Sequence, residues 1–266
     1  MAGTGVVQVE CETISSRRDG RILRLTLNRP NVHNAINKTM LREIREAVEA
    51  AVDDPEIRVV CLGAAGGKAF SAGIDVAYVK DLDGYGTRAV GRELHKTFLA
   101  LRTSEIPIVC AIDGLCLGAG LEMALSCDFM VATDRSTFGL PNIHRGIPAI
   151  VEAAILPIAV GIQATRELCY LGKYWDSAKA EQRGLIHKSV AVEDFEREVT
   201  SICEDLAQKS ARAIGTQKEI IHKWMTTDLE SAIDFSINTV VLNWLTDDQK
   251  EGMGAFLEKR QAEFKG

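Results

Sequence analysis

Little in the sequence marks a membrane-spanning or secreted protein. It has no run of eighteen or more apolar residues, which a transmembrane helix would need. Residues 1–10 lack a charged stretch followed by a long apolar core, and residues 263–266 do not form a peroxisomal ending of the Ser-Lys-Leu type. These absences predict a cytoplasmic protein with no membrane partner.

The sequence also lacks the patterns of disulfide frameworks and metal sites. Its seven cysteines are an odd number with no Cys-x-x-Cys pair, and most, such as Cys61, lie in apolar runs. We therefore expect buried, reduced thiols. The five histidines are scattered, without His-Glu-x-x-His or a comparable spacing, so we expect no metal site built from protein ligands.

Basic residues are outnumbered by acidic ones, 31 to 37, and aromatic residues are few. The net charge is -6, aromatic residues make up 6% of the chain, and no basic stripe with interleaved aromatics is present. Nucleic acid is therefore not an expected partner, because its phosphates require clustered cations.

The chain does have enough apolar residues for a large core, since 46% of its 266 residues are hydrophobic and 26% are charged. In the first half, short apolar runs alternate with amphipathic stretches, which is typical of strands joined by crossover helices. Predicted strands occupy residues 22–27, 57–63, 107–112 and 128–132, and predicted helices occupy residues 38–52 and 87–102.

From Pro148 onward the pattern is nearly all helical. Predicted helices occupy residues 149–160, 163–171, 177–183, 193–208, 213–225, 229–245 and 248–265, and one predicted strand occupies residues 185–190. No linker rich in Pro, Gly or Ser separates the two halves. We predict a mixed α/β body over residues 1–195, followed by a helical region over residues 196–266 that covers the site and mediates assembly.

Two glycine-rich turns each follow a predicted strand and precede a helix. Residues 70–75 read Phe-Ser-Ala-Gly-Ile-Asp, and residues 117–122 read Leu-Gly-Ala-Gly-Leu-Glu. Small residues let backbone N–H groups approach a ligand, and the N–H groups at a helix start have no partner inside the helix. Two such turns that converge would form an oxyanion hole, whose donors face negative charge developing on a carbonyl oxygen. For either turn alone, a simple tight strand-to-helix connection is the favoured interpretation.

Glu122 is the only acid between Asp113 and Asp128, and it lies on an otherwise apolar first helical turn. A carboxylate there fits a favourable dipole partner, but burial would raise its pKa toward the range useful for proton transfer. The sequence contains neither a phosphate-binding Gly-x-x-x-x-Gly-Lys-Ser/Thr loop nor a Gly-x-Gly-x-x-Gly dinucleotide turn after the first strand. Glu122 is therefore a candidate for acid–base catalysis.

The order of these motifs resembles that of the enoyl-CoA hydratase/isomerase (crotonase) family. The two turns are followed by Cys127-Asp128 and by Phe-Gly-Leu-Pro at residues 138–141, and the similarity extends from about residue 24 to about residue 185. The resemblance implies a crotonase-like spiral of ββα units whose C-terminal helices form a homotrimer or a dimer of trimers. It also implies an acyl-CoA substrate, with coenzyme A as part of the thioester and no separate cofactor.

The resemblance further implies roles for particular residues. The backbone N–H groups of Ile74 and Ala119 would hold the thioester carbonyl as an enolate forms, and Glu122 would transfer the proton. The residues expected to bind the substrate and its coenzyme A are Lys68, Ser71, Ala72, Asp75, Gly118 and Glu152.

Two positions depart from the family. Many relatives carry a lysine where this chain has Ala77, and typical hydratases carry a second glutamate where this chain has Asn142. An amide can hold a water molecule by hydrogen bonds but cannot exchange a proton at neutral pH. Glu152 and His144 are candidates to replace the missing acid, whereas Ile150 stands where dienoyl-CoA isomerases can place one.

We therefore predict an acyl-CoA enzyme in which Glu122 moves a proton beside an enolate. Hydration or dehydration and a double-bond shift both fit, with a lyase ahead of an isomerase. Acyl-CoA decarboxylation and carbon–carbon cleavage stay open, because they use the same hole with other acid groups. A non-catalytic protein that binds CoA esters also stays open; the loss of one glutamate favours it, while the intact 118–120 turn and Glu122 count against it.

Overall fold

Two β-sheets form the frame of the structure, a computed structural model that describes residues 8–265. Parts of the terminal segments used in the argument about targeting, residues 1–7 and 266, lie outside this range. Among the described residues, no helix combines the length and the apolar character needed to cross a bilayer.

The larger sheet has seven strands in the order β1-β2-β3-β4-β6-β8-β11. Its strands are β1 (Gln8–Glu10), β2 (Ile14–Asp19), β3 (Ile22–Leu27), β4 (Val59–Ala64), β6 (Ile108–Ile112), β8 (Phe129–Thr133) and β11 (Lys188–Val190). The first three strands pair antiparallel, and β3, β4, β6, β8 and β11 pair parallel. All residues of β6 are buried, as expected for a central parallel strand covered on both faces.

The smaller sheet has four strands in the order β10-β9-β7-β5. Its strands are β5 (Ala69–Ser71), β7 (Leu115–Leu117), β9 (Thr137–Gly139) and β10 (Tyr174–Asp176). The chain passes from a strand of the large sheet to a strand of the small sheet and then into a helix. Thus β4 and β5 lead to α2 (Val76–Val79) and α3 (Gly84–Thr103), and β6 and β7 lead to α4 (Ala119–Ala124). These repeated ββα units confirm the predicted spiral.

Helices cover both faces of the large sheet. Helix α1 (Lys38–Asp53) packs against α3 and buries the apolar stripe of Met40, Leu41, Ile44 and Val48. On the other face, α8 (Phe195–Ala207) packs beneath the sheet, where Val199 and Cys203 join a second core with residues of β4, β6 and β8. Helix α8 therefore packs with the body, although the predicted division at residue 195 assigns it to the C-terminal region.

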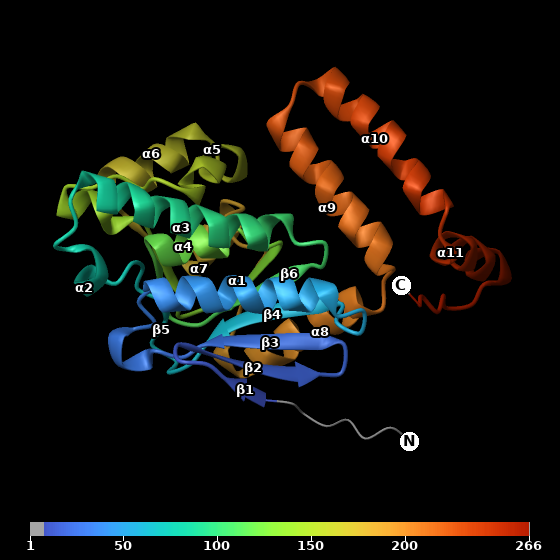
Figure 1. Ribbon diagram of the computed structural model, residues 1–266, viewed down its shortest axis with the longest axis horizontal. Coiled ribbons are helices and arrows are strands. Elements are labelled where there is room, and N and C mark those ends of the chain that lie inside the picture. Colours follow the sequence, from blue (N-terminus) through green and yellow to red (C-terminus); the bar gives the residue numbers. More distant parts are fainter. Residues whose placement is uncertain (1–7, 266) are drawn as a thin grey trace.

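Of the remaining helices, one packs against β9, β10 and β11, two pack on each other, and three form an arm. They are α5 (Leu156–Ala159), α6 (Ile162–Leu171), α7 (Ser177–Gln182), α9 (Ala211–Thr226), α10 (Leu229–Trp244) and α11 (Asp247–Glu258), with 3-10 turns η1 (Pro30–Val32), η2 (Pro141–Arg145), η3 (Glu152–Ile155) and η4 (Val192–Asp194). In Figure 1 the helices α9, α10 and α11 stand to one side of the body as a helical arm.

The predicted elements are confirmed where the apolar pattern is long and periodic. Two predicted helices are wrong in their bounds, because a proline or a left-handed residue interrupts them. The expected helix over residues 149–160 is instead η3 followed by the one-turn α5, because Pro157 removes a backbone donor and crowds the preceding turn. The expected helix over residues 248–265 ends at Glu258, where Lys259 turns to a left-handed φ of 55°. The sequence patterns do not predict β1, β2 or the strands of the small sheet.

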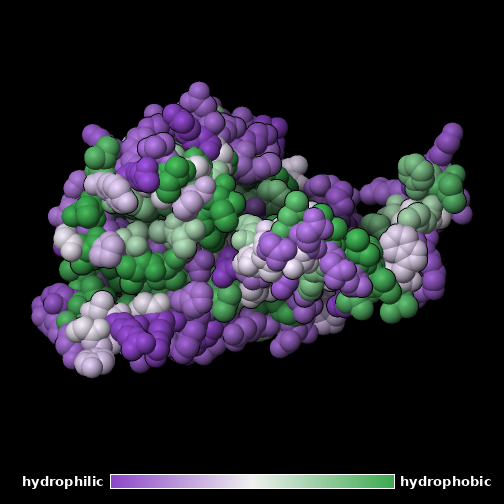
Figure 2. Space-filling model, turned by 90° about the horizontal axis from the view of Figure 1, so that it is seen from above, coloured by the Kyte–Doolittle hydropathy of each residue, from purple (hydrophilic) through white to green (hydrophobic). Residues whose placement is uncertain are grey.

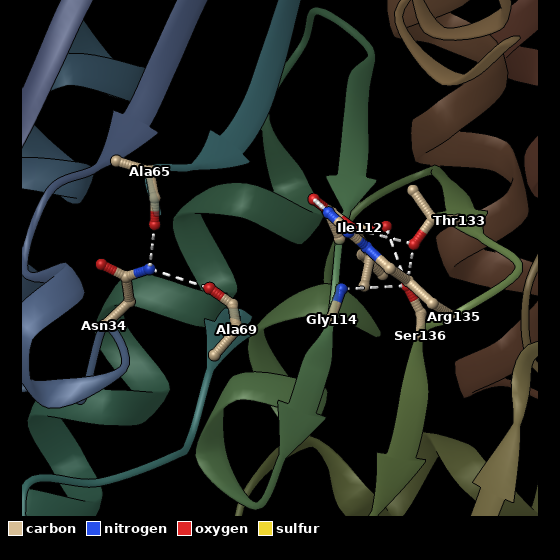
Figure 3. A network of polar contacts seen from close by, with 9 residues as sticks. Asn34, Ala65, Ala69, Ile112, Gly114, Thr133, Arg135 and Ser136 are labelled. Atoms are coloured by element: carbon tan, nitrogen blue, oxygen red, sulfur yellow. Dashed lines mark hydrogen bonds and ion pairs between the residues drawn. The ribbon is translucent and has the colours of Figure 1, made fainter. Parts of the chain in front are cut away.

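Two buried polar networks hold the loops that lead into the small sheet (Figure 3). The side-chain amide of Asn34 donates to the carbonyl oxygens of Ala65 (3.0 Å) and Ala69 (2.9 Å), on either side of the loop before β5. The hydroxyl of Ser136 accepts from the N–H of Gly114 (3.2 Å), at the corner between β6 and β7. These contacts hold the chain where β5 and β7 begin, and these two strands lead into the glycine-rich turns.

Replacing Asn34 by alanine is expected to destabilise the protein by roughly 2–3 kcal/mol, because two carbonyl groups lose their donor, the N–H of Arg29 loses its acceptor, and alanine would be strained at the left-handed φ of 52°. The matched control is Asn31→Ala in the same loop, where the side chain is exposed; its effect should stay within about 0.5 kcal/mol. Urea unfolding at fixed protein concentration measures both values. Equal effects of the two substitutions would contradict the assigned role of Asn34.

Candidate active site

The two glycine-rich turns meet backbone to backbone. Gly73 has a φ of +98°, and a Cβ added to it would lie 2.9 Å from the carbonyl oxygen of Leu117 and 3.4 Å from the nitrogen of Ala119. Gly118, which precedes α4, has a φ of +52°. Both positions need glycine, because a side chain would be strained at these angles and would fill the space between the turns.

Both N–H groups predicted for the oxyanion hole lie at this meeting point. The turn around Ile74 is fixed from both sides, since the N–H of Ile36 donates to the carbonyl of Gly73 and the N–H of Asp75 donates to the carbonyl of Ile36, each at 2.8 Å. Neither the N–H of Ile74 nor that of Ala119 donates to a backbone or side-chain acceptor among residues 8–265. The structure thus brings together two donors that have no internal acceptor.

Ser71 and Asp75 support the first turn from within. The Ser71 hydroxyl donates to the carbonyl of Asn34 (2.9 Å) and accepts from the N–H of Gly73 (3.2 Å). Asp75 binds Arg29 at 2.9 Å and accepts from the N–H of Ala77 at the start of α2. Both side chains are therefore occupied by contacts that fix the turn.

Lys68 and Ala72 are exposed beside the turn. The carbonyl of Lys68 accepts from the N–H of Leu115, so its backbone is held against β7 while its side chain faces outward. The expected contacts of Lys68, Ser71, Ala72 and Asp75 with coenzyme A stay predictions.

Glu122 lies on the first turn of α4, one helical turn beyond Gly118, and is only 2% exposed. Its Oε1 accepts from the N–H groups of Val151 (2.9 Å) and Ala153 (3.1 Å). Burial raises the pKa of this carboxyl above its ordinary value of 4.5; the backbone donors oppose the increase in part, and the charge of Glu152 adds to it. The expected burial of Glu122 and the expected direction of its pKa change are confirmed.

Asn142 lies on η2, next to the second turn. Its Oδ1 would be 3.3 Å from a Cβ on Gly118, and its Nδ2 donates to the carbonyl of Pro148 over 3.4 Å. The structure therefore places this amide against the turn that carries Ala119 and, three residues on, Glu122. His144, on the same 3-10 turn, contacts the carbonyl of Gly172 through its Nε2 at 3.3 Å and so faces the end of α6.

Glu152, the other candidate acid, is 4% exposed but turned toward α3. Its Oε1 lies 3.2 Å from Nδ1 of His95, and its Oε2 lies 3.5 Å from Nε of Arg102. Arg102 in turn donates to Nδ1 of His222 on α9 at 2.9 Å. The carboxylate of Glu152 is thus paired inside an ionic cluster, and its neighbours Val151 and Ala153 hold Glu122.

Sequence reasoning missed two features of this site. One is the support of Glu122 by the N–H groups of Val151 and Ala153, which come from a segment without regular periodicity. The other is Cys169 on α6, where burial and the nearby carboxylate of Glu122 raise the pKa of the thiol. Nothing in the sequence around this cysteine distinguishes it from the other cysteines in apolar runs.

A pair of unoccupied backbone donors beside a buried carboxyl of raised pKa defines a class of site that can stabilise an oxyanion and move a proton next to it. Comparisons with known proteins agree with this chemistry. The sequence profile of the family described as "Enoyl-CoA hydratase/isomerase" matches residues 17–266. The chain belongs to the enoyl-CoA hydratase/isomerase family.

Individual relatives are similar over nearly their whole length. A crotonyl-CoA hydratase of Syntrophomonas wolfei is 35% identical over 254 residues, which cover 95% of this chain and 98% of that protein. A short-chain-enoyl-CoA hydratase of Clostridium acetobutylicum is 29% identical, over 96% of this chain and 98% of that protein. A crystal structure of an enoyl-CoA hydratase from Bacillus anthracis has a TM-score of 0.92 and 28% identity, and the match covers 96% of this chain and 100% of that one.

The raised pKa of Glu122 predicts a pH-dependent effect of Glu122→Gln on stability. Above pH 4.5 the native carboxyl holds its proton more tightly than the unfolded one, so wild-type stability falls as pH rises through the native pKa. Glutamine keeps an acceptor for the two N–H groups without a charge. The variant should therefore gain stability relative to wild type between pH 5 and pH 8.

Denaturant unfolding across this pH range measures the difference. The control is Glu204→Gln on the exposed face of α8, which should follow wild type at every pH. A difference between Glu122→Gln and wild type that stays constant with pH would contradict the raised pKa.

Proposed function

We propose that the protein hydrates a 2-enoyl-CoA thioester with Glu122 as its single catalytic carboxyl. The observation that carries the proposal is the buried Glu122, held through one oxygen, next to two N–H groups without an internal acceptor. The family of the chain and the names of its relatives, a crotonyl-CoA hydratase and a short-chain-enoyl-CoA hydratase, support a short 2-enoyl substrate.

The N–H groups of Ile74 and Ala119 would polarise the thioester carbonyl. Negative charge moves onto this oxygen as water adds at the third carbon of the acyl chain, and fixed donors stabilise that charge without reorganising. Because the donors belong to the backbone, Ala119 serves as well as the glycine that many relatives have at this position.

Glu122 would handle both proton transfers. Its Oε1 stays with Val151 and Ala153, while the remaining oxygen takes a proton from water as the hydroxyl joins the third carbon. The same carboxyl then returns the proton to the second carbon, so the reaction consumes one water and leaves Glu122 unchanged. A raised pKa suits this exchange at neutral pH.

Asn142 would orient the water rather than exchange protons with it. Its Oδ1 lies beside Gly118 and can accept a hydrogen bond from the water, but the amide does not titrate. Glu152 does not replace the missing acid in this scheme, because its carboxylate is paired with His95 and Arg102.

A second candidate function is a double-bond shift from a 3-enoyl-CoA to a 2-enoyl-CoA. The observation in its favour is Asn142 itself, since isomerisation needs one proton shuttle and no water. In both reactions Glu122 and the two donors have the same roles, so substrate comparisons must separate them.

Assembly into a homotrimer or a dimer of trimers is part of the proposal. One face of α10 exposes a stripe of apolar side chains, Leu229, Ile233, Ile237, Val241 and Trp244. Figure 2 shows hydrophobic colours along the helical arm. An apolar surface of this kind supports contact with other copies of the chain.

Glu122→Gln is expected to lower kcat for hydration of crotonyl-CoA by about 10²–10⁴-fold with little change in KM, because it removes the proton shuttle and keeps the shape. Asn142→Ala should lower kcat less, and Asn142→Glu should retain or raise it. Loss of the enoyl absorbance reports hydration, and its gain from a 3-enoyl-CoA reports isomerisation.

Faster turnover of the 3-enoyl-CoA than of crotonyl-CoA would favour the isomerase. Absence of turnover with either thioester, with no effect of Glu122→Gln on any acyl-CoA tested, would remove the catalytic role of Glu122 and favour decarboxylation, cleavage or binding alone.

Gly73→Ala is expected to reduce kcat/KM by about 10²-fold or more, because the new methyl group would press on Leu117 and Ala119 and displace a donor. The control is Gly20→Ala, where φ is also positive, at +58°, but no atom lies within 4 Å of the added Cβ. Both variants carry backbone strain, and only the first should lose activity in the crotonyl-CoA assay. Equal losses would mean that strain, and not the meeting of the turns, explains the effect.

A further inference from the structure

A cavity of about 650 Å³ lies between α3 and the segment that supports Glu122. Its lining includes Ile150, Val151 and Glu152 on one side and the exposed face of α3 on the other. Val151 connects this cavity with the candidate active site, since it lines the cavity and its N–H donates to Oε1 of Glu122. The cavity therefore lies next to the segment that holds Glu122, and its size suits a short acyl chain.

The α3 wall of this cavity is rich in basic side chains. Arg88, Arg92, His95 and Arg102 line it, all on the same helix, and the lining holds a single acid, Glu152. His95 and Arg102 contact Glu152, so the negative charge of this carboxylate is already paired. The cavity keeps an excess of positive charge from the other two arginines.

Arg88 and Arg92 have no ion-pair or hydrogen-bond partner within the described part of the chain. Nearby acids are occupied elsewhere: Asp83 caps α3 through the N–H of Gly86, and Glu93 binds Lys96 and Arg45. The two guanidinium groups are therefore available to an anion that enters the cavity.

The smallest residues of the α3 wall leave room for such an anion. Gly84 has no atom within 4 Å of where a Cβ would stand, and Gly91 meets only the tip of Ile150 at 3.4 Å. An alkyl end would gain nothing from two arginines, whereas a carboxylate would form charge-assisted, two-pronged hydrogen bonds with them.

We propose that this cavity selects acyl-CoA substrates whose distal end carries a carboxylate, namely monothioesters of short unsaturated dicarboxylic acids. The inference rests on the proposed function and names its substrate class. Arg88 and Arg92 are specificity-determining residues that hold the distal carboxylate, while Ile74, Ala119 and Glu122 act on the other end of the chain.

The test compares glutaconyl-CoA with 2-pentenoyl-CoA, which has the same number of acyl carbons and a methyl group in place of the carboxylate. Wild type should favour glutaconyl-CoA at least 10-fold in kcat/KM, and the preference should shrink as ionic strength rises. Arg88→Gln combined with Arg92→Gln should lower kcat/KM for glutaconyl-CoA at least 10-fold and change that for 2-pentenoyl-CoA less than 2-fold. The control is Arg42→Gln on the exposed face of α1, which should change neither value.

Inhibition by free coenzyme A identifies the anion that the arginines hold. If coenzyme A inhibits the double variant as strongly as wild type, the arginines hold the distal carboxylate. If coenzyme A inhibits the double variant more weakly and kcat/KM falls equally for both thioesters, the arginines bind coenzyme A phosphates and the proposal is overturned. Equal use of the two thioesters by wild type would also overturn it and leave the hydratase function intact. If neither thioester were hydrated, the proposed function itself would fail.

Discussion

The close approach of two backbone turns is the constraint on which the site depends. A Cβ at Gly73 would meet Leu117 and Ala119, and Gly118 itself takes a left-handed φ. A third glycine lets α4 pack closely on β5, because a Cβ at Gly120 would lie 2.7 Å from Cβ of Ser71. Larger residues would separate the small sheet from α4, and the two free N–H groups would no longer share one location.

Burial of Glu122 follows from the same constraint. Since α4 sits directly on β5, its first turn is enclosed, and a charged side chain on that turn must find donors or lose its charge. Two backbone N–H groups of the 150–153 segment replace part of the hydration that the carboxylate loses on burial. Desolvation is still the larger effect, so the pKa of Glu122 stays raised. A carboxyl with a pKa raised in this way keeps its proton to a higher pH than a fully solvated or a salt-bridged one, and this suits it to proton transfer.

The sequence predicts the turns and Glu122 well because their requirements are local. Glycine at left-handed positions and an acid on an apolar helical turn are visible within a few residues. The three-residue strands of the small sheet are too short to show a period of two, so they were not predicted. The partners of Glu152 lie 50 to 57 residues away on α3, and only the fold reveals that this candidate acid is paired.

That pairing links the site to the helical arm. Glu152 binds Arg102, Arg102 donates to His222, and burial together with the charge of Arg102 lowers the pKa of His222, which suits a neutral ring as acceptor. The residues on either side of Glu152 hold Glu122. Because the charge of Glu152 also contributes to the raised pKa of Glu122, the position of α9 and the acidity of the candidate catalytic carboxyl depend on one ionic cluster. A chain of polar contacts thus runs from the arm to the segment that holds Glu122, even though the arm stands to one side of the body (Figure 1).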